Sequence, residues 1–155
     1  MPDLLAGTIV AALDTPPTVY AQDTTAITNI SSTSYIPGTP EVGVTFIAPT
    51  TGRVMLSVGA SMRNDAANSD RVAVTAEIRE NDASGAVFLA ATVFRGVATD
   101  GIPTAGDYCT VGHTTLVTGL TPGGQYFARS MHIKFGSVGT TGDIAMRDIL
   151  VAPAT

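Results

Sequence analysis

The sequence predicts an all-β protein, an antiparallel β-sandwich of the jelly-roll type with an extended N-terminal arm. After residue 41, apolar residues alternate with small or polar ones, which is the period of a strand that buries one face. Glycine and proline, 16 and 9 of the 155 residues, separate these runs. No window of about 11 residues combines a helical period with capping residues. Short strands between such turns are typical of a sandwich or barrel.

The clearest element is the stretch Val42–Ala60. Val44 and Phe46 alternate with Gly43 and Thr45, and the pattern then breaks at a Pro/Gly turn over residues 48–52. The alternation resumes with Val54, Leu56 and Val58. Alternation on both sides of a turn predicts a β-hairpin with one buried face.

The remaining strands follow at regular spacing. Arg71–Glu80 places Val72, Val74, Ala76 and Ile78 on one face and polar residues on the other. Further strands are expected at Val87–Gly96, Tyr108–Val117, Gln125–Phe135 and Asp143–Val151. The alternation predicts a core of Val44, Phe46, Val54, Leu56, Val58, Val74, Ile78, Phe127, Ile133 and Ile149.

Residues 1–40 differ from the rest, and we interpret them as an arm with a peripheral strand beside a sandwich of residues 41–155. A short apolar stretch over residues 8–13 precedes the polar run Gln22–Ser34, and turn residues close the segment. The run has too little apolar content to hold itself in place, so we expect the arm to attach the domain to a larger particle. The apolar anchors predicted for this attachment are Leu4, Leu5, Ile9 and Val10.

The composition argues against several classes of binding partner. Charged residues make up 14% of the chain, against about 25% in typical proteins, and the net charge is −5. We expect both that Thr and Ser fill solvent-facing positions and that neighbouring subunits cover much of the surface. Eight scattered Lys and Arg residues argue against nucleic-acid binding. We expect no membrane partner, because no run approaches the ~20 apolar residues of a span. The N-terminus does not resemble a secretory signal, since Asp3 stands where a positive charge belongs.

Candidate chemical sites have simpler interpretations. His113 and His132 lie on separate predicted strands, where an ordinary hydrogen bond is favoured over a metal site. The loop Arg63–Asp70 carries oxygen ligands without EF-hand spacing, so a solvated loop is favoured over a weak calcium site. Asp143 and Asp148, five residues apart, should point to opposite faces of one strand. We therefore expect no metal, no cofactor and no enzymatic activity, and the single cysteine excludes an intrachain disulfide.

The segment Gly119–Tyr126 (GLTPGGQY) resembles the turn-then-tyrosine element of many β-sandwiches, in which the tyrosine hydroxyl bonds back to the loop backbone. It supports the fold without indicating a function.

Together with that turn, three segments carry a family resemblance: Ala21–Pro40, Val42–Ala60 and Arg147–Pro153. The chain resembles small virion structural proteins of tailed phages that infect actinobacteria, of the minor tail, head-fibre or capsid-decoration type. The resemblance implies a compact β-sandwich that trimerises on virions, with an N-terminal arm for attachment to other capsid or tail proteins. It also implies a protein made in the host cytoplasm and located in the virion.

Two functions remain open. One is a structural component that decorates or cements the particle, and the other is a receptor-binding module at a fibre tip that recognises a host-surface glycan. The loops at 63–70, 99–107 and 136–143 hold mostly small residues and few aromatics, which favours the first. We expect a homotrimer with the apolar segment Val87–Gly96 near its interface. The predicted interface residues there are Phe88, Leu89, Val93 and Phe94.

Overall fold

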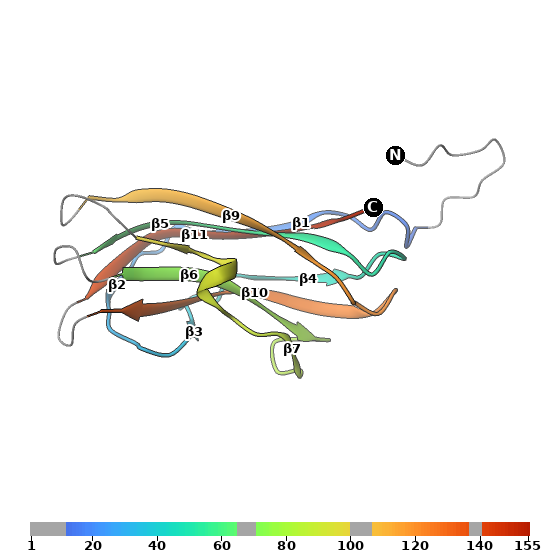
Figure 1. The fold of residues 1–155 in the computed structure, drawn as a ribbon, viewed down its shortest axis with the longest axis horizontal. Helices are drawn as coiled ribbons and strands as arrows, with labels where there is room; N and C mark the ends of the chain where they lie inside the picture. Colours follow the sequence, from blue (N-terminus) through green and yellow to red (C-terminus); the bar gives the residue numbers. More distant parts are fainter. Residues whose placement is uncertain (1–11, 65–70, 100–106, 137–140) are drawn as a thin grey trace.

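The computed structural model describes residues 12–64, 71–99, 107–136 and 141–155. Two antiparallel sheets lie face to face and the molecule is elongated along the strands (Figure 1). The predicted all-β sandwich is confirmed, with a single 3-10 turn among the described residues. The elements are β1 Val19–Asp23, β2 Ile27–Ile30, β3 Ile36–Pro37, β4 Gly43–Ile47, β5 Val54–Asn64, β6 Arg71–Glu80, β7 Val87–Leu89, η1 Val93–Arg95, β8 Val97–Ala98, β9 Cys109–Val117, β10 Gln125–Phe135 and β11 Gly142–Pro153.

The strand order is that of a jelly roll. The first sheet runs β1-β11-β5-β9, with β2 also paired to β11. The second runs β3-β10-β6-β7, with β4 paired to β10 and β8 to β6. The pairs β1–β11, β4–β10, β5–β9 and β6–β7 are nested, as in one long hairpin rolled so that successive parts fall in alternate sheets. The described connections thus make a sandwich with jelly-roll topology.

The core lies between the sheets. In β5 the residues with even numbers from Val54 to Met62 are buried, as period-2 alternation requires. Phe46 stacks on Tyr126 with ring centroids 5.7 Å apart, and Phe88 meets Tyr126 edge-on at 5.3 Å. The backbone N–H of Thr121 donates to the Tyr126 hydroxyl at 3.0 Å, so the predicted turn-then-tyrosine element is present.

One predicted core residue is misplaced. All of the others are buried, but Phe127 is half-exposed, because Tyr126 and Ala128 on either side of it point inward. The Phe127 ring instead lies against Gly43 on the outer face of the second sheet, where a Cβ on Gly43 would collide with it.

The expected single strand Val87–Gly96 is wrong. The segment is divided into β7, η1 and the approach to β8. It crosses β6: the Thr75 hydroxyl donates to the carbonyl of Thr92 at 2.8 Å, and a Cβ on Gly96 would collide with the carbonyl of Val74. Phe88 and Leu89 of this segment pack against the body of the sandwich, whereas Phe94 projects outward.

The described part of the segment 1–40 is joined to both sheets. β1 and β2 pair with β11, and β3 pairs with β10. The chain before β1 is held at one end of the sandwich, where the backbone N–H of Thr50 donates to the carbonyl of Leu13 at 3.0 Å. The expected arm lies partly in residues 1–11, outside the described residues, and its separate role stays a prediction.

A polar strip also lies between the sheets. Ser130, His132 and Lys134 of β10 and Arg147 of β11 are all buried. The fully buried Arg147 donates through Nη2 to the carbonyl of Pro40 at 2.5 Å, and this nitrogen lies 3.8 Å from an Asp23 carboxylate oxygen. Its guanidinium thereby ties β11 to the first sheet's edge and to the loop before β4.

Candidate functional site

The outer face of the β1-β11-β5-β9 sheet carries a shallow depression. Gly59 of β5 and Gly112 of β9 lie directly opposite each other, and both belong to the outward-facing set of their strands. Neither has a side chain, and the backbone is exposed at Gly112 but buried at Gly59. The depression has a volume of about 360 Å³. It is lined by Ser57, Val58, Gly59, Thr110, Val111, Gly112, His113, Thr114, Met146 and Asp148.

Polar groups border this depression. The Ser57 and Thr114 hydroxyls are hydrogen bonded at 2.7 Å on one side of the glycine pair. On the other side, the Asp148 carboxylate leans over Gly59, with Oδ1 2.7 Å from where a Cβ would stand. Above Gly112 the space is open, since a Cβ there would meet no atom nearer than the Val58 carbonyl oxygen at 3.7 Å. The depression is therefore open to solvent over β9 and has one carboxylate at its β11 side.

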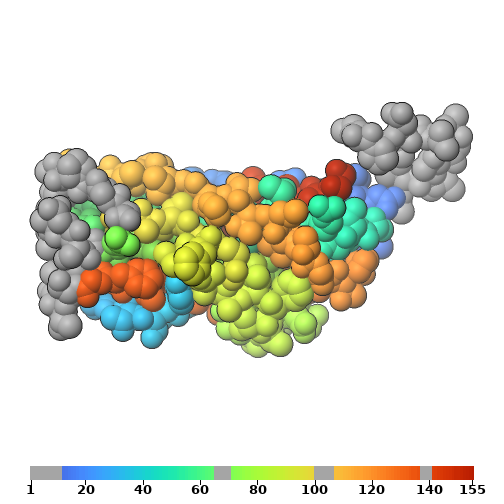
Figure 2. Space-filling view, viewed as in Figure 1, coloured from blue at the N-terminus to red at the C-terminus, as the bar shows by residue number. Residues whose placement is uncertain are grey.

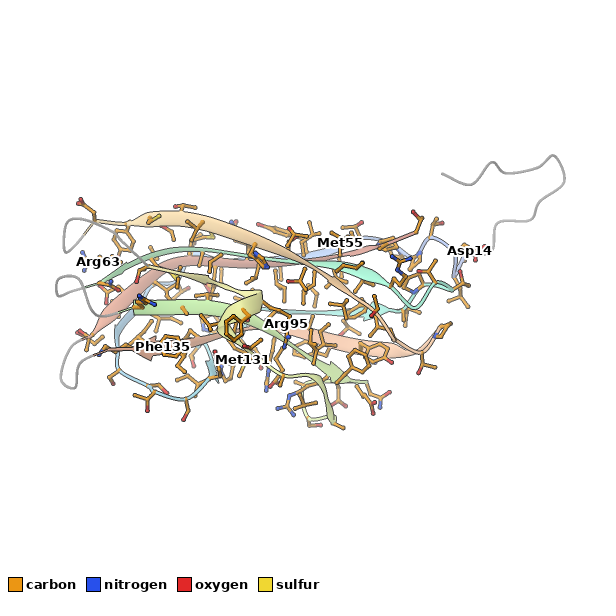
Figure 3. All side chains as sticks on the ribbon, in the orientation of Figure 1. Asp14, Met55, Arg63, Arg95, Met131 and Phe135 are labelled. Carbon is orange, nitrogen blue, oxygen red and sulfur yellow. The ribbon has the colours of Figure 1, made fainter. Side chains whose placement is uncertain are left out.

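Large apolar side chains extend the same face toward the end of the sheet where β9 finishes. Met55 and Leu116 are direct cross-strand neighbours and are 37% and 44% exposed. Tyr20 of β1 is 53% exposed on the same face, beyond Leu150 of β11. Figure 3 shows Met55 on the upper sheet, and in Figure 2 the residues of β9 (orange) run along the upper edge of the molecule. The face is thus mainly uncharged, with Ser, Thr, Gly and apolar side chains.

A second candidate surface is η1, which lies in front of β6 (Figure 1). Phe94 at its centre is 88% exposed, the most exposed of the large apolar side chains that the structure describes. Beside it, Arg95 donates through Nη2 to the carbonyl of Ala90, while its Nε is buried without a hydrogen-bond partner in the described part of the chain. Figure 3 shows Arg95 at this turn.

The four residues predicted at an interface in Val87–Gly96 differ in their surroundings. Phe88 and Leu89 are half-buried and pack against the main hydrophobic cluster of this chain. Val93 is also half-buried, whereas Phe94 projects outward. The predicted anchors Leu4, Leu5, Ile9 and Val10 lie outside the described residues. The two sets are not brought together by anything the structure describes, and their roles stay predictions.

The candidate chemical residues are dispersed. His132 is buried between the sheets, and burial, with a smaller effect of the nearby Arg147 charge, lowers its pKa from 6.5 to about 4. His113 is exposed on β9. Cys109 is free and half-buried at the start of β9. Within residues 12–64, 71–99, 107–136 and 141–155, no three His, Cys, Asp or Glu side chains are grouped as metal ligands.

The expectation for Asp143 and Asp148 is wrong in its geometry. A register shift between Ile144 and Met146 inserts one residue, so both aspartates lie opposite outward-facing residues of β5, Arg63 and Gly59. Three β5 residues still separate those partners along the strand, and Asp143 pairs with the Arg63 guanidinium at 2.5 Å. The two carboxylates therefore share a face without forming a pair.

The loop considered for calcium falls mostly on residues 65–70, outside the described residues. At its start, the Arg63 guanidinium carbon lies 5.0 Å from the centre of the Tyr108 ring and the same group pairs with Asp143. Figure 3 places Arg63 at the end of the sandwich opposite Asp14.

No protein-family model matches the chain, and no curated protein matches it by sequence. Among solved structures, it is similar to the VP2 subviral particle of infectious bursal disease virus, with 15% identity and a TM-score of 0.47 over 99% of this chain and 37% of that one. A structure of the Gt strain of the same virus gives 14% identity and a TM-score of 0.44 over 98% and 36% of the two chains. The enzymatically active domain of bacteriophage CBA120 tailspike protein 4 gives 15% identity and a TM-score of 0.34 over 88% and 18%.

The chain therefore spans well under half of each of these three proteins. No described helix is long and apolar enough to cross a membrane.

Sequence reasoning missed the depression. Gly59 and Gly112 are far apart in the chain, and each looks like an ordinary interruption of an alternating strand. A glycine inside a strand often marks a place where another group approaches the backbone closely, and that signal was available in both strands.

Proposed function

We propose that this protein is a structural component of a virion, a trimeric jelly-roll protein that decorates or cements the capsid or the tail. The observation that carries the proposal is the nested pairing of β1–β11, β4–β10, β5–β9 and β6–β7. Viral capsid proteins repeatedly use this double-sheet roll, as do lectins and cupins. Because one fold serves several functions, the topology alone does not decide between them, and the surface must be considered too.

The surface supports a role in assembly. Exposed Met55, Leu116 and Tyr20 share one sheet face, and Phe94 projects from a neighbouring side. A protein with 14% charged residues that also exposes these side chains has surface suited to burial against other subunits. In this proposal no nucleic acid, membrane or cofactor is a partner, and the protein is not an enzyme.

Two measurements test the proposal. Sedimentation equilibrium of the purified protein should give three times the 15.8 kDa chain mass. An antibody raised against it should label intact particles from a lysate of the cells that carry its gene, by immunogold electron microscopy. Labelling confined to soluble protein would contradict a virion role.

The arm provides the attachment in this proposal. Deleting residues 1–11 removes Leu4, Leu5, Ile9 and Val10 but leaves β1 intact, since that strand begins at Val19. The shortened protein should fold and form trimers, but it should no longer bind particles that were assembled without the full-length protein. Unchanged binding would show that the attachment lies elsewhere.

The alternative is a receptor-binding module that recognises a host glycan. One observation favours it: the hydroxyls of Ser57 and Thr114 and the carboxylate of Asp148 converge on an open depression. Such groups can hydrogen bond sugar hydroxyls. Binding on a glycan array that is lost in Asp148→Asn would support this function over the structural one.

A further inference from the structure

We propose that Phe94 of one copy of this chain seats in the Gly59–Gly112 depression of a second copy, with Arg95 pairing to the Asp148 carboxylate beside it. The proposal gives the contact that would join the subunits of the trimer and rests on that part of the proposed function.

The two surfaces match in shape. Phe94 projects from a three-residue turn and is 88% exposed, so its ring is available to a partner. The depression of about 360 Å³ lies at the lower end of the range for ligand pockets, about 300–1,000 Å³. Its floor over Gly112 is bare backbone, on which a flat ring can lie. Large aromatic side chains that fill such sites on a partner are the usual anchors of protein interfaces.

The two surfaces also match in charge. The Arg95 guanidinium donates through Nη2 to the carbonyl of Ala90 and its Nε is buried, so only its outer nitrogens can face a partner. Asp148 places its carboxylate over Gly59 at the border of the depression. Arg95 follows Phe94 in sequence, and Asp148 lies opposite Gly59, the cross-strand neighbour of Gly112, so in this proposal the guanidinium and the carboxylate belong to the same contact. An arginine–carboxylate pair at the border would fix the orientation of the ring as well as add attraction.

The two surfaces lie on different sides of the molecule, so one copy can contact two others. The turn η1, which carries Phe94, lies in front of β6 (Figure 1), whereas the depression is on the outer face of the first sheet. A contact between two different surfaces is heterologous and joins each copy to the next, closing into a ring when the rotation permits. A stable interface buries about 800 Å² on each partner, more than one ring supplies. The exposed Met55 and Leu116 next to the depression would supply further apolar area.

One variant fills the depression, and a separate variant removes the Phe94 ring. Gly112→Val adds a β-branched side chain into open space, where a Cβ meets nothing nearer than 3.7 Å, so the fold should be kept. Phe94→Ser removes an exposed ring with little effect on the core. The matched controls are Thr45→Val, which places the same β-branched side chain at an exposed position of β4, and Val87→Ser, which removes an exposed apolar side chain from β7.

Sedimentation equilibrium at micromolar concentration gives the readout. We expect Gly112→Val and Phe94→Ser each to weaken association at least about tenfold, while both controls associate as the parent does. Arg95→Asp and Asp148→Arg should each weaken association, and the double variant should recover part of it, which a purely structural role of either residue would not produce.

The outcomes separate this contact from the proposed function. A parent trimer that is unaffected by Gly112→Val and Phe94→Ser overturns the contact and leaves the trimer standing. A monomeric parent overturns both the contact and the trimer, and particle labelling then tests the virion role by itself. An open-ended assembly broken by both variants supports the contact and overturns the trimer.

Discussion

His132 should make the stability of the fold depend on pH in the mildly acidic range. It lies buried on β10 between the sheets, and burial, reinforced by the charge of Arg147, lowers its pKa from 6.5 to about 4. In the folded protein the imidazole therefore stays neutral where the unfolded chain already binds a proton. A group of this kind stabilises the fold fully above the unfolded pKa, and the stabilisation is lost as the pH falls from about 6.5 toward about 4.

The magnitude follows from the size of the shift. Each pKa unit corresponds to about 1.4 kcal/mol, so lowering the pH from about 7.5 to about 5 should reduce the free energy of unfolding by about 1–2 kcal/mol. The carboxylates of Asp23 and Asp82 do not interfere in this range. Hydrogen bonds from the backbone of Thr25 and the side chain of Ser84 hold their pKa values below 3.8, so their contributions are lost at lower pH.

Urea unfolding at several pH values, followed by circular dichroism, measures this effect. In His132→Gln the free energy of unfolding should vary less over the same range, whatever its absolute value. Ser130→Ala is the control, because Ser130 is another buried polar residue on the same face of β10 but does not titrate. If His132→Gln keeps the pH dependence of the parent, the neutral buried imidazole is not the cause and the reasoning fails.

Three further predictions concern the core and the outer face of the second sheet. Phe46→Ala should lower the free energy of unfolding by about 3–5 kcal/mol, because the ring is 5% exposed and stacks on Tyr126; a loss below about 1 kcal/mol in urea would refute its core role. Tyr126→Phe should cost about 1–2 kcal/mol by leaving the backbone N–H of Thr121 without its acceptor, and an unchanged urea midpoint would contradict this. Glu77→Gln should lower the free energy of unfolding by about 2–4 kcal/mol, since this buried carboxylate accepts a hydrogen bond from Arg129 at 2.7 Å. A variant with the same thermal unfolding midpoint as the parent would contradict this.

Local alternation determined the fold class from the sequence. In β5 and β6 the residues between the apolar ones are small or polar except Met55, so only one register places Val54, Leu56, Val74 and Ile78 in the core. The turn before Tyr126 was also predictable, because its hydrogen bond joins residues five apart in the chain. These features depend on neighbours in sequence, and a sequence displays such neighbours directly.

Alternation gave the wrong face in two situations. In one, two adjacent residues were equally suited to the core, and in the other a β-bulge inserted an extra residue into the strand. In β10, Tyr126 and Phe127 are both aromatic, and the contact of Tyr126 with Phe46 from another strand decides which one points inward. In β11, the inserted residue between Ile144 and Met146 reverses the face that simple counting gives to Asp148. Both outcomes depend on pairing with distant strands.

The candidate site belongs wholly to the tertiary level. Gly59 and Gly112 form a depression only because β5 and β9 pair in one register, and a shift of one residue would place other side chains between them. The burial of Arg147 likewise depends on Asp23 and Pro40, which reach it from the other end of the chain. The sequence determined by itself which strands form and which face most of them bury, because those properties repeat every two residues. The tertiary structure decided which strands are neighbours, and hence which side chains meet, because long-range pairing has no local signal.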